Sequence, residues 1–392
     1  MPTAVTITDV VSGPLFERMV EVRRAIHRRP ELAFEEERTA RLIIGELDSL
    51  GLPYSYGGKG TGVVARLHVS DRAPTIALRA DMDALPGREA TGLSFASTVE
   101  GKRHACGHDA HVAMVVGAAY LLAATPPPVN VRFVFQPAEE RGGGARTVLA
   151  SGELDGVAAI FGGHVTGSFR VGQVQAARGV ITAQSDAFRV DIRGRGGHGA
   201  RPHEATDAAV IMSLLVVVLQ TLVSREINPV HPSVVTIGRA AAGTAANVIA
   251  GEAVIEGSIR TTEQSVRTHL HEGVVRMARA LGELHNATLV PTITPGYPPV
   301  INCERETAIA YAAATDVVGA HGVMPLDHPS MGSEDFSYYL ASIPGCYMRF
   351  GARRDEQDYV PLHSPAFDID EDVLRVGALC FARIARTYPA GR

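Results

Sequence analysis

The sequence of 392 residues predicts an α/β protein in which a mixed, mostly parallel sheet is flanked by helices and a second, smaller domain is inserted. Short apolar runs bounded by Gly and Pro alternate with helical patterns as far as Phe161, which is typical of buried strands in an α/β sheet. Near Gln184 the pattern changes to a strict alternation of apolar and polar residues. The length also exceeds what one hydrophobic core usually serves.

The elements of the first part follow from the spacing of apolar residues. Two helices are expected between Gly13 and Leu50, separated at Pro30 because proline lacks an amide hydrogen and interrupts a helix. Gly51 ends the second helix. The remaining elements of this part are a helix at 108–122 and buried strands at 62–69, 75–78, 131–135 and 158–161.

The second part contains the elements of a split βαβ sandwich. The order is strand 186–193, glycine-rich loop 194–199, helix 206–225, strands 233–239 and 253–260, helix 263–281 and strand 287–293. This βαββαβ order is that of a ferredoxin-like domain. Prolines at 295, 298 and 299 mark the return to the first domain, which resumes through 308–318 and closes with a helix at 371–386. We therefore expect a larger domain of residues 1–184 and 295–392 and an inserted domain of residues 185–294.

Composition excludes several classes of partner. The net charge is −5, and no run of basic residues carries interleaved aromatic residues, so no nucleic-acid surface is expected. No secretory signal is recognisable, and the apolar run 208–219 is too short to span a bilayer, so no membrane contact is expected. The four cysteines are widely spaced and form no disulfide framework. These features predict a reduced, cytoplasmic protein.

The segment from His104 to His111 concentrates metal ligands. It holds one thiol, three imidazoles and one carboxylate, and Gly107 permits a tight turn between Cys106 and His108. Thiolate and imidazole bind borderline-soft divalent metals. Further residues of ligand type follow downstream, so the segment predicts a metal site: Glu139, Glu140, His164 and His363.

Polar residues follow three of the apolar runs directly. The run 75–78 leads to Arg79-Ala-Asp81-Met-Asp83, 131–135 leads to Gln136-Pro-Ala-Glu139-Glu140, and 158–161 leads to Gly162-Gly-His164. Ligands of open α/β sheets bind beyond the carboxyl ends of the strands. We therefore expect these groups to converge at one edge of one sheet.

The adjacent acids Glu139 and Glu140 are expected to have different roles. Neighbouring residues that leave a strand point to opposite sides, so one carboxylate can bind metal while the other faces a substrate. A water activated by metal needs a nearby base to accept its proton. The alternative is a solvated loop that enters a helix, where acids favour the positive end of the helix dipole. The Cys/His cluster favours the catalytic interpretation.

The histidines fall into three groups. His164 and His363 are expected on tight, irregular backbone at a strand end and in a loop, because Gly163 precedes the first and Pro365 follows the second closely. His104 and His111 flank the cluster, and the sequence leaves open whether they support it or lie on a helix surface. The others are expected to be structural or solvent-facing: His27, His68, His231, His269, His271, His285, His321 and His328.

Several motifs occur in one order along nearly the whole chain, and with them the sequence resembles the co-catalytic metallopeptidase and aminoacylase family. It is most similar to the subgroup of hippurate hydrolases and auxin-conjugate amidohydrolases. The motifs are Arg28-Arg-Pro-Glu-Leu32, Arg79-Ala-Asp-Met-Asp-Ala-Leu-Pro86, His104-Ala-Cys-Gly-His-Asp109, Gln136-Pro-Ala-Glu-Glu140, Gly196-Gly-His-Gly-Ala-Arg-Pro-His203, Asn247-Val-Ile249, Gly332-Ser-Glu-Asp-Phe336 and Leu362-His-Ser-Pro365.

The resemblance implies a role for each of these site residues. Two divalent metal ions would be held by Cys106, His108, Glu140, His164 and His363, with Cys106 as the bridge. Glu139 would be the general base, and Asp83 would orient a ligand histidine. In the inserted domain, His198 would reach across a dimer interface to the oxyanion, while Asn247 and Arg260 would bind the substrate carboxylate.

The resemblance leaves the metal open. Where the wider family has a His-x-Asp stretch this chain has Asp81-Met-Asp83, and Cys106 replaces a bridging aspartate. Thiolate and imidazole suit zinc, and carboxylate and imidazole suit manganese nearly as well, with nickel and cobalt as further candidates. The implied assembly is a homodimer or a dimer of dimers, with the inserted domain as lid and dimerisation domain.

These features together predict a metal-dependent amidohydrolase that cleaves N-acyl amino acids, hippurate-like or N-acetylated, with a metal-activated water and a glutamate base. A carboxypeptidase or dipeptidase on the same scaffold is the nearest alternative. A non-catalytic homologue that binds metal or peptide is the alternative from another class. The presence of Glu139 beside a complete ligand set favours an enzyme.

Overall fold

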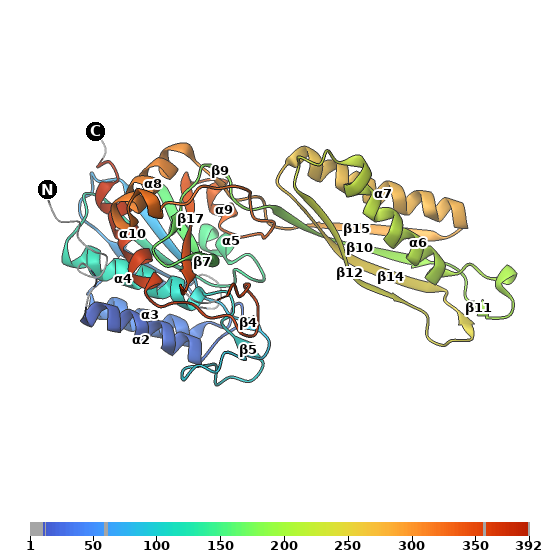
Figure 1. The fold of residues 1–392 in the computed structure, drawn as a ribbon, viewed down its shortest axis with the longest axis horizontal. Coiled ribbons are helices and arrows are strands. Elements are labelled where there is room, and N and C mark those ends of the chain that lie inside the picture. The colour runs from blue at the N-terminus through green and yellow to red at the C-terminus, as the bar shows by residue number, and fades with distance from the viewer. Residues whose placement is uncertain (1–10, 12, 59–61, 356–357, 391–392) are drawn as a thin grey trace. The chain divides into compact units, whose positions relative to one another are not determined.

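The computed structural model describes residue 11 and residues 13–58, 62–355 and 358–390. The chain forms two compact units (Figure 1). Unit 1 contains the chain up to Ile181 together with Ile301–His328 and Glu334–Arg392, and unit 2 contains Thr182–Val300 and Pro329–Ser333.

A seven-stranded sheet forms the centre of unit 1, in the order β1-β2-β6-β3-β7-β17-β8. The four central strands, β6, β3, β7 and β17, run parallel, and the outer pairs are antiparallel. The mixed, mostly parallel sheet predicted from the sequence is confirmed. The strands are β1 (Tyr54–Tyr56), β2 (Val63–Leu67), β3 (Thr75–Asp81), β6 (Asn130–Gln136), β7 (Val157–Arg170), β8 (Val174–Gln175) and β17 (Gly345–Arg353).

Two adjacent glycines of β7 show how the two faces of this sheet are covered. A Cβ on Gly163 would lie 2.6 Å from the ring of Phe350, which packs against Phe381 of α10. A Cβ on Gly162 would lie 2.7 Å from the ring of Phe336, which precedes α9 on the other face. Aromatic rings therefore pack against the centre of β7 on both faces of the sheet.

Helix α4 fills the core of unit 1, since almost every side chain along it is buried. It packs against α2, α10 and strand β3. An apolar helix surrounded on all sides by protein has no solvent face to leave polar. The helices of this unit are α2 (Pro14–Arg28), α3 (Glu37–Ser49), α4 (His108–Ala124), α5 (Gly144–Ala150), α8 (Glu304–Val318), α9 (Ser337–Leu340) and α10 (Val373–Thr387).

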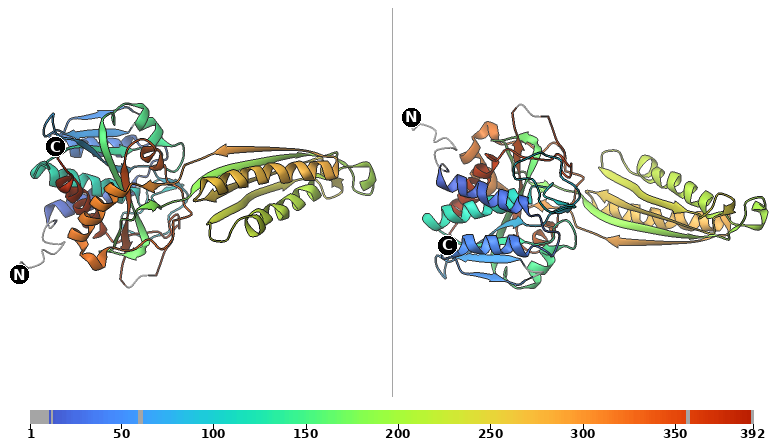
Figure 2. Two further views of the ribbon diagram at one scale, coloured as in Figure 1. Left: turned by 90° about the horizontal axis from the view of Figure 1, so that it is seen from above. Right: turned by 90° about the horizontal axis from the view of Figure 1, so that it is seen from below.

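Unit 2 is an antiparallel sheet of four strands with two helices on one face (Figures 1 and 2). The sheet order is β12-β14-β10-β15, so β12 and β15 are its edges. The chain order is the predicted βαββαβ. Its elements are β10 (Gln184–Arg193), α6 (Ala208–Thr221), β12 (Ser233–Ala242), β14 (Glu252–Thr261), α7 (Gln264–His285) and β15 (Thr288–Pro295).

The first helix of unit 2 is longer than the apolar run suggested. Helix α6 continues into a π turn, and together they span Ala208–Glu226 with a mean hydropathy of 2.0. By length and composition alone this helix could cross a membrane, which corrects the expectation that the run was too short. One side of it packs on the sheet of unit 2 through Ile211, Leu215 and Leu219. Helices that cover a sheet in soluble proteins meet the same criteria of length and hydropathy.

The structure corrects the predicted strands at two places, β7 and β17. Strand β7 runs to Arg170, well beyond the predicted end at Phe161, so His164 lies inside a strand and not on irregular backbone at its end. The glycines that suggested a turn are instead required by close aromatic contacts. Strand β17 was not predicted at all, and it pairs with the part of β7 that carries His164.

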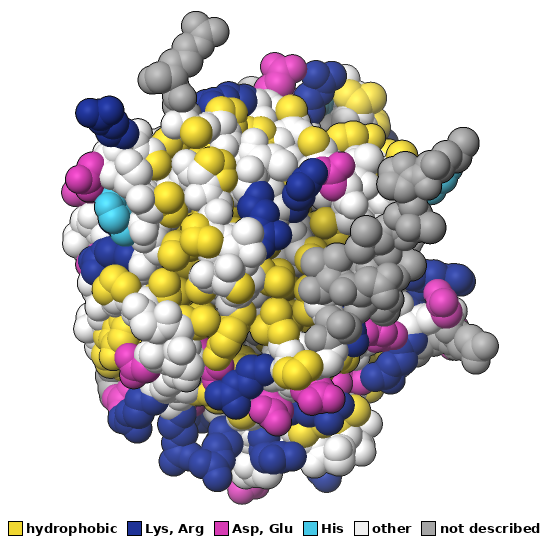
Figure 3. Space-filling model, turned by 90° about the vertical axis from the view of Figure 1, so that its left-hand side faces the viewer, with side chains coloured by type: hydrophobic (Ala, Val, Ile, Leu, Met, Phe, Trp, Pro, Cys, Tyr) yellow, Lys and Arg dark blue, Asp and Glu magenta, His cyan; other side chains and the backbone are white. Residues whose placement is uncertain are grey.

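One face of the molecule, viewed in Figure 3, carries apolar side chains among charged ones. Lysine and arginine side chains lie beside aspartate and glutamate side chains there, and neither sign of charge forms a separate field (Figure 3).

Candidate active site

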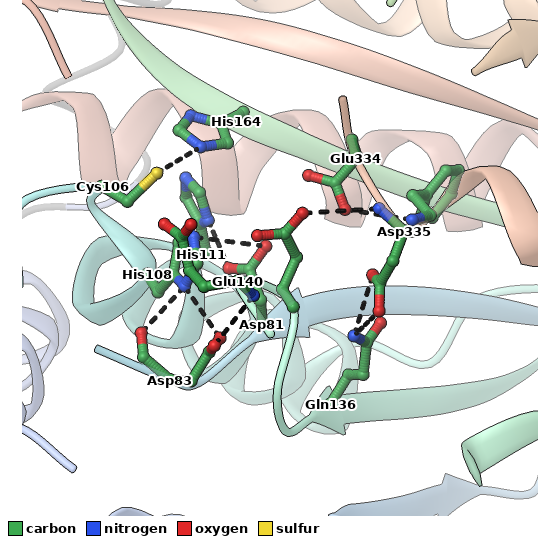
Figure 4. Close-up of polar contacts among 12 residues, drawn as sticks. Asp81, Asp83, Cys106, His108, His111, Gln136, Glu140, His164, Glu334 and Asp335 are labelled. Atoms are coloured by element: carbon green, nitrogen blue, oxygen red, sulfur yellow. Dashed lines mark hydrogen bonds and ion pairs between the residues drawn. The ribbon is translucent and has the colours of Figure 1, made fainter. Parts of the chain in front are cut away.

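The parallel strands of unit 1 bring the predicted polar groups to one edge of the sheet. Strands β6 and β7 lie on either side of β3 and run parallel to it. Asp81 ends β3, and Gln136 ends β6 at the register position opposite Asp81. The predicted convergence at the carboxyl edge is therefore found (Figure 4).

The loop before α4 presents the Cys106 and His108 side chains. Gly107 between them has φ of 89°, a left-handed conformation that glycine adopts without strain. A Cβ at this position would lie 2.3 Å from Cγ2 of Val165. The tight turn that the sequence predicts at Gly107 is thus required both by the backbone and by the neighbouring strand.

Two sets of three ligand-type side chains share the thiol of Cys106. One set is Cys106, His108 and His164, and the other is Cys106, Glu140 and His363. In each set the potential ligand atoms lie within 4.8 Å of one another. The Cys106 Sγ is 3.2 Å from Nε2 of His164 and 3.3 Å from Nε2 of His363. A shared sulfur between two triads is the arrangement that a bridged metal pair requires.

His108 is held in position by the residue predicted to orient it. Its Nδ1 lies 2.9 Å from the carbonyl oxygen of Asp83 and 3.2 Å from Oδ1 of the same residue. A proton on Nδ1 satisfies both contacts and leaves the lone pair on Nε2. That Nε2 is buried and has no hydrogen-bond partner among the described residues. The other carboxylate oxygen of Asp83 accepts the amide of Glu140 at 2.9 Å.

The donor set fits a metal pair. Burial raises the pKa of the Cys106 thiol, which a bound divalent cation would offset by favouring the thiolate. His363 has φ of 67°, an unusual conformation for a residue with a side chain, and it directs Nε2 to 3.3 Å from Glu140 Oε1. Two bound ions would satisfy three groups that lie together here. These are the unpartnered Nε2 of His108, the shared thiol of Cys106 and the ring of His363.

Glu139 and Glu140 lie on a turn after β6 and not on the strand itself, so the argument from opposite sides of a strand does not apply to them. Both carboxylates have an oxygen within 4.8 Å of a ring nitrogen of His108, but their other neighbours differ. Glu140 lies with His363 and Cys106, whereas Oε1 of Glu139 accepts a hydrogen bond from the amide of Asp335 at 3.4 Å. Burial, together with the nearby carboxylates of Glu334 and Asp335, raises the pKa of Glu139 well above its ordinary value. A carboxyl with a raised pKa is suited to accept and return a proton near neutral pH.

The turn that presents Glu139 is held by a buried acid on another element. Ala138 has φ of 54°, and its amide donates to Oε1 of Glu36 at 2.9 Å. Burial raises the pKa of Glu36 to about 7. The left-handed residue before Glu139 is therefore fixed by a hydrogen bond from outside the motif, which no local pattern indicated.

A buried arginine organises the acids behind Glu139. The guanidinium of Arg79 is fully buried and lies 2.6 Å from Asp81, 3.1 Å from Glu334 and 3.0 Å from Asp335. The amide of Gln136 donates to both carboxylate oxygens of Asp335 at 2.9 Å. The motifs around residues 79, 136 and 332 thus form one network, and no role was predicted from the sequence for Arg79, Glu334 or Asp335.

His111 lies beside two of the proposed metal ligands, His108 and His164. Its Nδ1 lies 2.6 Å from Oδ1 of Asp81, and its Nε2 accepts the amide of Val165 at 2.9 Å. Val165 follows the ligand His164, and the rings of His111 and His164 are 4.6 Å apart. Both ring nitrogens of His111 therefore have hydrogen-bond partners. The sequence left open whether His111 supports the cluster or lies on a helix surface, and the structure places it in a supporting position.

His104 lies in a separate buried cluster. Its ring is 6.2 Å from that of His27, which bonds Asp109 at 2.8 Å, and burial lowers the pKa of His104 to about 3. Arg23 also contacts Asp109, at 3.2 Å. His27 is therefore structural, as expected, and His104 is a neutral core histidine.

In unit 2, His198 and Asn247 line one open cavity of about 830 Å³. His198 is exposed and pairs with Val248 in a short antiparallel ladder, β11 (Gly197–His198) with β13 (Val248–Ile249). Its Nδ1 accepts the amide of Ala200 at 3.1 Å, so the proton lies on Nε2, which is the donor that an oxyanion requires.

Arg260 lies at the other end of β14 from this cavity. The cavity includes residues Glu252 to Val254 at the start of β14, and Arg260 lies about 20 Å further along the strand at ~3.3 Å per residue. One of its terminal nitrogens donates to the carbonyl oxygen of Met331 at 3.0 Å. One copy of unit 2 therefore does not bring Asn247 and Arg260 to the same carboxylate.

Two ligand triads that share a thiol, beside a buried carboxyl of raised pKa, define a metal-dependent hydrolase. A model of the peptidase family M20/M25/M40 matches residues 77–387, and the chain belongs to this family.

Known relatives agree with this assignment. The chain is 37% identical to thermostable carboxypeptidase 1 of Saccharolobus solfataricus, over 94% of each chain. It is 38% identical to IAA-amino acid hydrolase ILR1-like 4 of Arabidopsis thaliana, over 97% of this chain and 88% of the relative. The crystal structure of the Bacillus subtilis YXEP protein, a dinuclear metal-binding peptidase from the M20 family, has a TM-score of 0.81 and 34% identity over 95% of this chain and 97% of that one.

Membership of this family establishes which class of protein the chain is. It is a hydrolase that acts on amide carbon–nitrogen bonds, so the non-catalytic alternative does not hold. The donor set and the dinuclear relative together support two metal ions.

Proposed function

We propose that the protein hydrolyses the amide bond of N-acyl amino acids. The observation that carries this proposal is the pair of ligand triads joined at Cys106, with Glu139 held beside them on a fixed turn. The relative from Arabidopsis, by its name, hydrolyses an amino acid conjugate. Our proposal gives this chain the same class of substrate.

Each residue of the site has a defined task in this proposal. Cys106, His108, Glu140, His164 and His363 would hold two divalent ions, zinc or manganese, with nickel or cobalt as alternatives. Bound there, the ions supply Lewis acidity toward the scissile carbonyl and toward water. Glu139 accepts the proton of the attacking water and returns it to the departing amine.

The same proposal assigns His198, Asn247 and Arg260 to the substrate. Nε2 of His198 would donate to the oxyanion, and the other two would bind the carboxylate. Because Asn247 and Arg260 lie far apart within one unit 2, the simplest complete site takes them from two copies of the chain. A homodimer, or a dimer of dimers, would supply both.

The exposed side of α6 supports a dimer through unit 2. Val210, Leu214 and Val217 are exposed on this helix, and Val217 is 66% exposed. Apolar side chains gathered on one face are typical of a protein interface. The neighbouring edge strand β12 also has one side without a partner strand in the sheet. Pairing of both elements with a second copy would cover them.

The test compares the two adjacent glutamates. Glu139→Gln is expected to keep the metal and lose about 10²–10⁴-fold in kcat, the range for a general base. Glu140→Gln is expected to lose metal first, because it removes a charged ligand. Metal content by elemental analysis and turnover of N-acetyl and N-benzoyl amino acids provide the readouts. Near-normal kcat in Glu139→Gln would overturn the assigned role.

A carboxypeptidase or dipeptidase activity is the second candidate, favoured by the 37% identity to a carboxypeptidase. The same metals and the same base would serve both substrates. A parallel series of dipeptides and N-acyl amino acids separates the two candidates by kcat/KM. A higher value for the dipeptides would replace the first proposal with the second.

A further inference from the structure

Arg349 of β17 lies beside a metal-ligand position on the central sheet. In the parallel ladder between β7 and β17, Arg349 is the register partner of His164. Register partners of neighbouring strands point to the same face of a sheet and are about 4.8 Å apart. Arg349 thus projects from the face that carries His164, at the same level of the sheet.

The same face of β17 carries a second residue of the active site. Tyr347, two positions earlier and therefore on the same side of the strand, donates its hydroxyl to Oε2 of Glu334 at 2.5 Å. Met348 and Phe350 point the other way, into the core beneath α10. The side chain of Arg349 consequently lies with the polar groups of the site and not with the apolar core.

The guanidinium of Arg349 makes no hydrogen bond and no ion pair with any described residue, although the residue is half-buried. Burial lowers its pKa from the ordinary value, and Tyr347 and Glu334 offset this in part. An arginine remains charged at neutral pH in any case. A half-buried guanidinium without a carboxylate loses part of its hydration and gains no ion pair in return.

The nearest acid already has other partners. Glu334 accepts from the guanidinium of Arg79 at 3.1 Å, from the amide of Phe336 at 3.0 Å and from Tyr347. Its two oxygens thus share three donors, and none of these donors is Arg349. The five N–H donors of the Arg349 guanidinium therefore have no protein acceptor among the described residues.

We propose that Arg349 is a substrate-binding residue that pairs with a carboxylate of the substrate, an inference that rests on the proposed amide hydrolysis. A guanidinium presents two parallel N–H groups that match a carboxylate. Its place beside His164 puts that carboxylate within a few atoms of the scissile amide. This cation belongs to unit 1 and is separate from the Asn247 and Arg260 positions of unit 2.

The carboxylate could come from either half of the substrate, and three leucine derivatives distinguish the sources. N-acetyl-leucine carries only the α-carboxylate, N-succinyl-leucinamide carries only a carboxylate on the acyl half, and N-acetyl-leucinamide carries neither. Arg349→Gln is expected to lower kcat/KM about 10- to 100-fold for the derivative whose carboxylate it binds, through KM. The uncharged derivative should be unaffected, and Arg349→Lys should recover part of the loss.

Arg353→Gln is the matched control, because Arg353 lies on the same strand but pairs with Arg170 away from the ligands. Its kcat/KM should equal that of the wild type on all three compounds. An equal loss on all three compounds in Arg349→Gln, or a loss of bound metal, would show a structural role beside His164 and overturn the inference. Unchanged kinetics on both carboxylates would also overturn it.

Calorimetry separates a failure of this inference from a failure of the proposed function. In metal-loaded Glu139→Gln, the added change Arg349→Gln should weaken binding of the charged derivative by the same factor. This measurement needs no turnover. If the wild type hydrolyses none of the three compounds, the proposed function is wrong, and equal calorimetric affinities with and without Arg349 would then refute its role independently.

Discussion

At the scale of single residues, the site depends on side chains that never touch the substrate. The five proposed metal ligands and Glu139 were predicted to converge, and the structure brings these side chains together. The sequence could not predict what holds them. Glu36 and Asp335 reach the site from distant parts of the chain, and only the folded sheet shows that their contacts fix the turn at Glu139.

His111 is expected to determine how tightly one of the ions binds. It accepts the amide of Val165 and packs on His164, so His111→Ala would leave that amide without its partner and free the ligand ring to move. Loss of such a supporting group typically costs about 10- to 100-fold in metal affinity. His111→Gln keeps an acceptor and should lose less.

Calorimetric titration of the metal-free protein with zinc measures this effect. The exposed His321→Ala is the control, since it lies outside the site. Equal zinc affinities of His111→Ala and the wild type would show that His164 is positioned without His111.

Glu36 should give the protein a pH-dependent stability. Its pKa is raised by burial from about 4.5 in the unfolded chain to about 7 in the folded one. The folded state therefore holds the proton more tightly, and this contribution is complete below about pH 4.5 and is lost as the pH rises through 7. The shift corresponds to about 3 kcal/mol.

Glu36→Gln removes this titration and retains an oxygen that can accept the amide of Ala138. Urea unfolding of the metal-free wild type and variant at pH 5 and pH 8 is the measurement. From pH 5 to pH 8 the wild type should lose the stability that the Glu36 proton contributes, whereas the variant has no such proton to lose. The variant should therefore become more stable relative to the wild type as the pH rises. A difference between the two proteins that is the same at both pH values would contradict the raised pKa.

At the scale of elements, apolar runs predicted the strands whose residues are mostly apolar and failed where glycines lie within the strand. Thr75–Leu78 and Val131–Phe135 are found within β3 and β6. Gly162 and Gly163 looked like a turn because local propensity disfavours glycine in strands. Their function is to admit Phe336 and Phe350, which are far away in sequence, so no local pattern reveals it.

Gly163→Ala tests this explanation at the level of β7. The new methyl group would lie 2.6 Å from Phe350 and 3.1 Å from the carbonyl oxygen of Met348, so β7 and β17 would have to separate. Overpacking of this kind costs about 1–3 kcal/mol. Gly238→Ala is the control, since nothing lies within 4 Å of its added Cβ.

Thermal unfolding compares the two variants with the wild type. A Gly163→Ala protein as stable as Gly238→Ala would mean that the contacts at β7 relax without cost. In that case the glycines of β7 would need another explanation than aromatic packing.

At the scale of the whole molecule, catalysis by His198 requires a second copy in our proposal, and mixed variants test it. His198→Ala retains Glu139, and Glu139→Gln retains His198, so each homodimer lacks one essential group at both sites. In a mixed dimer, one site combines the intact Glu139 of one chain with the intact His198 of the other. The second site has neither group. Random exchange at equal concentrations makes about half of the dimers mixed, each with one working site of two, which predicts about a quarter of wild-type activity.

The control for this mixture is a pair that cannot complement. Glu139→Gln mixed with Glu140→Gln removes two groups of the same unit 1 site, so each active site of a mixed dimer lacks one of them. Subunit exchange is verified by mass spectrometry of the mixed species. If the first mixture stays inactive after exchange, His198 acts within its own chain or only shapes the loop. Recovery in the first mixture alone would establish that His198 of one copy serves the site of the other, so that activity depends on the assembly.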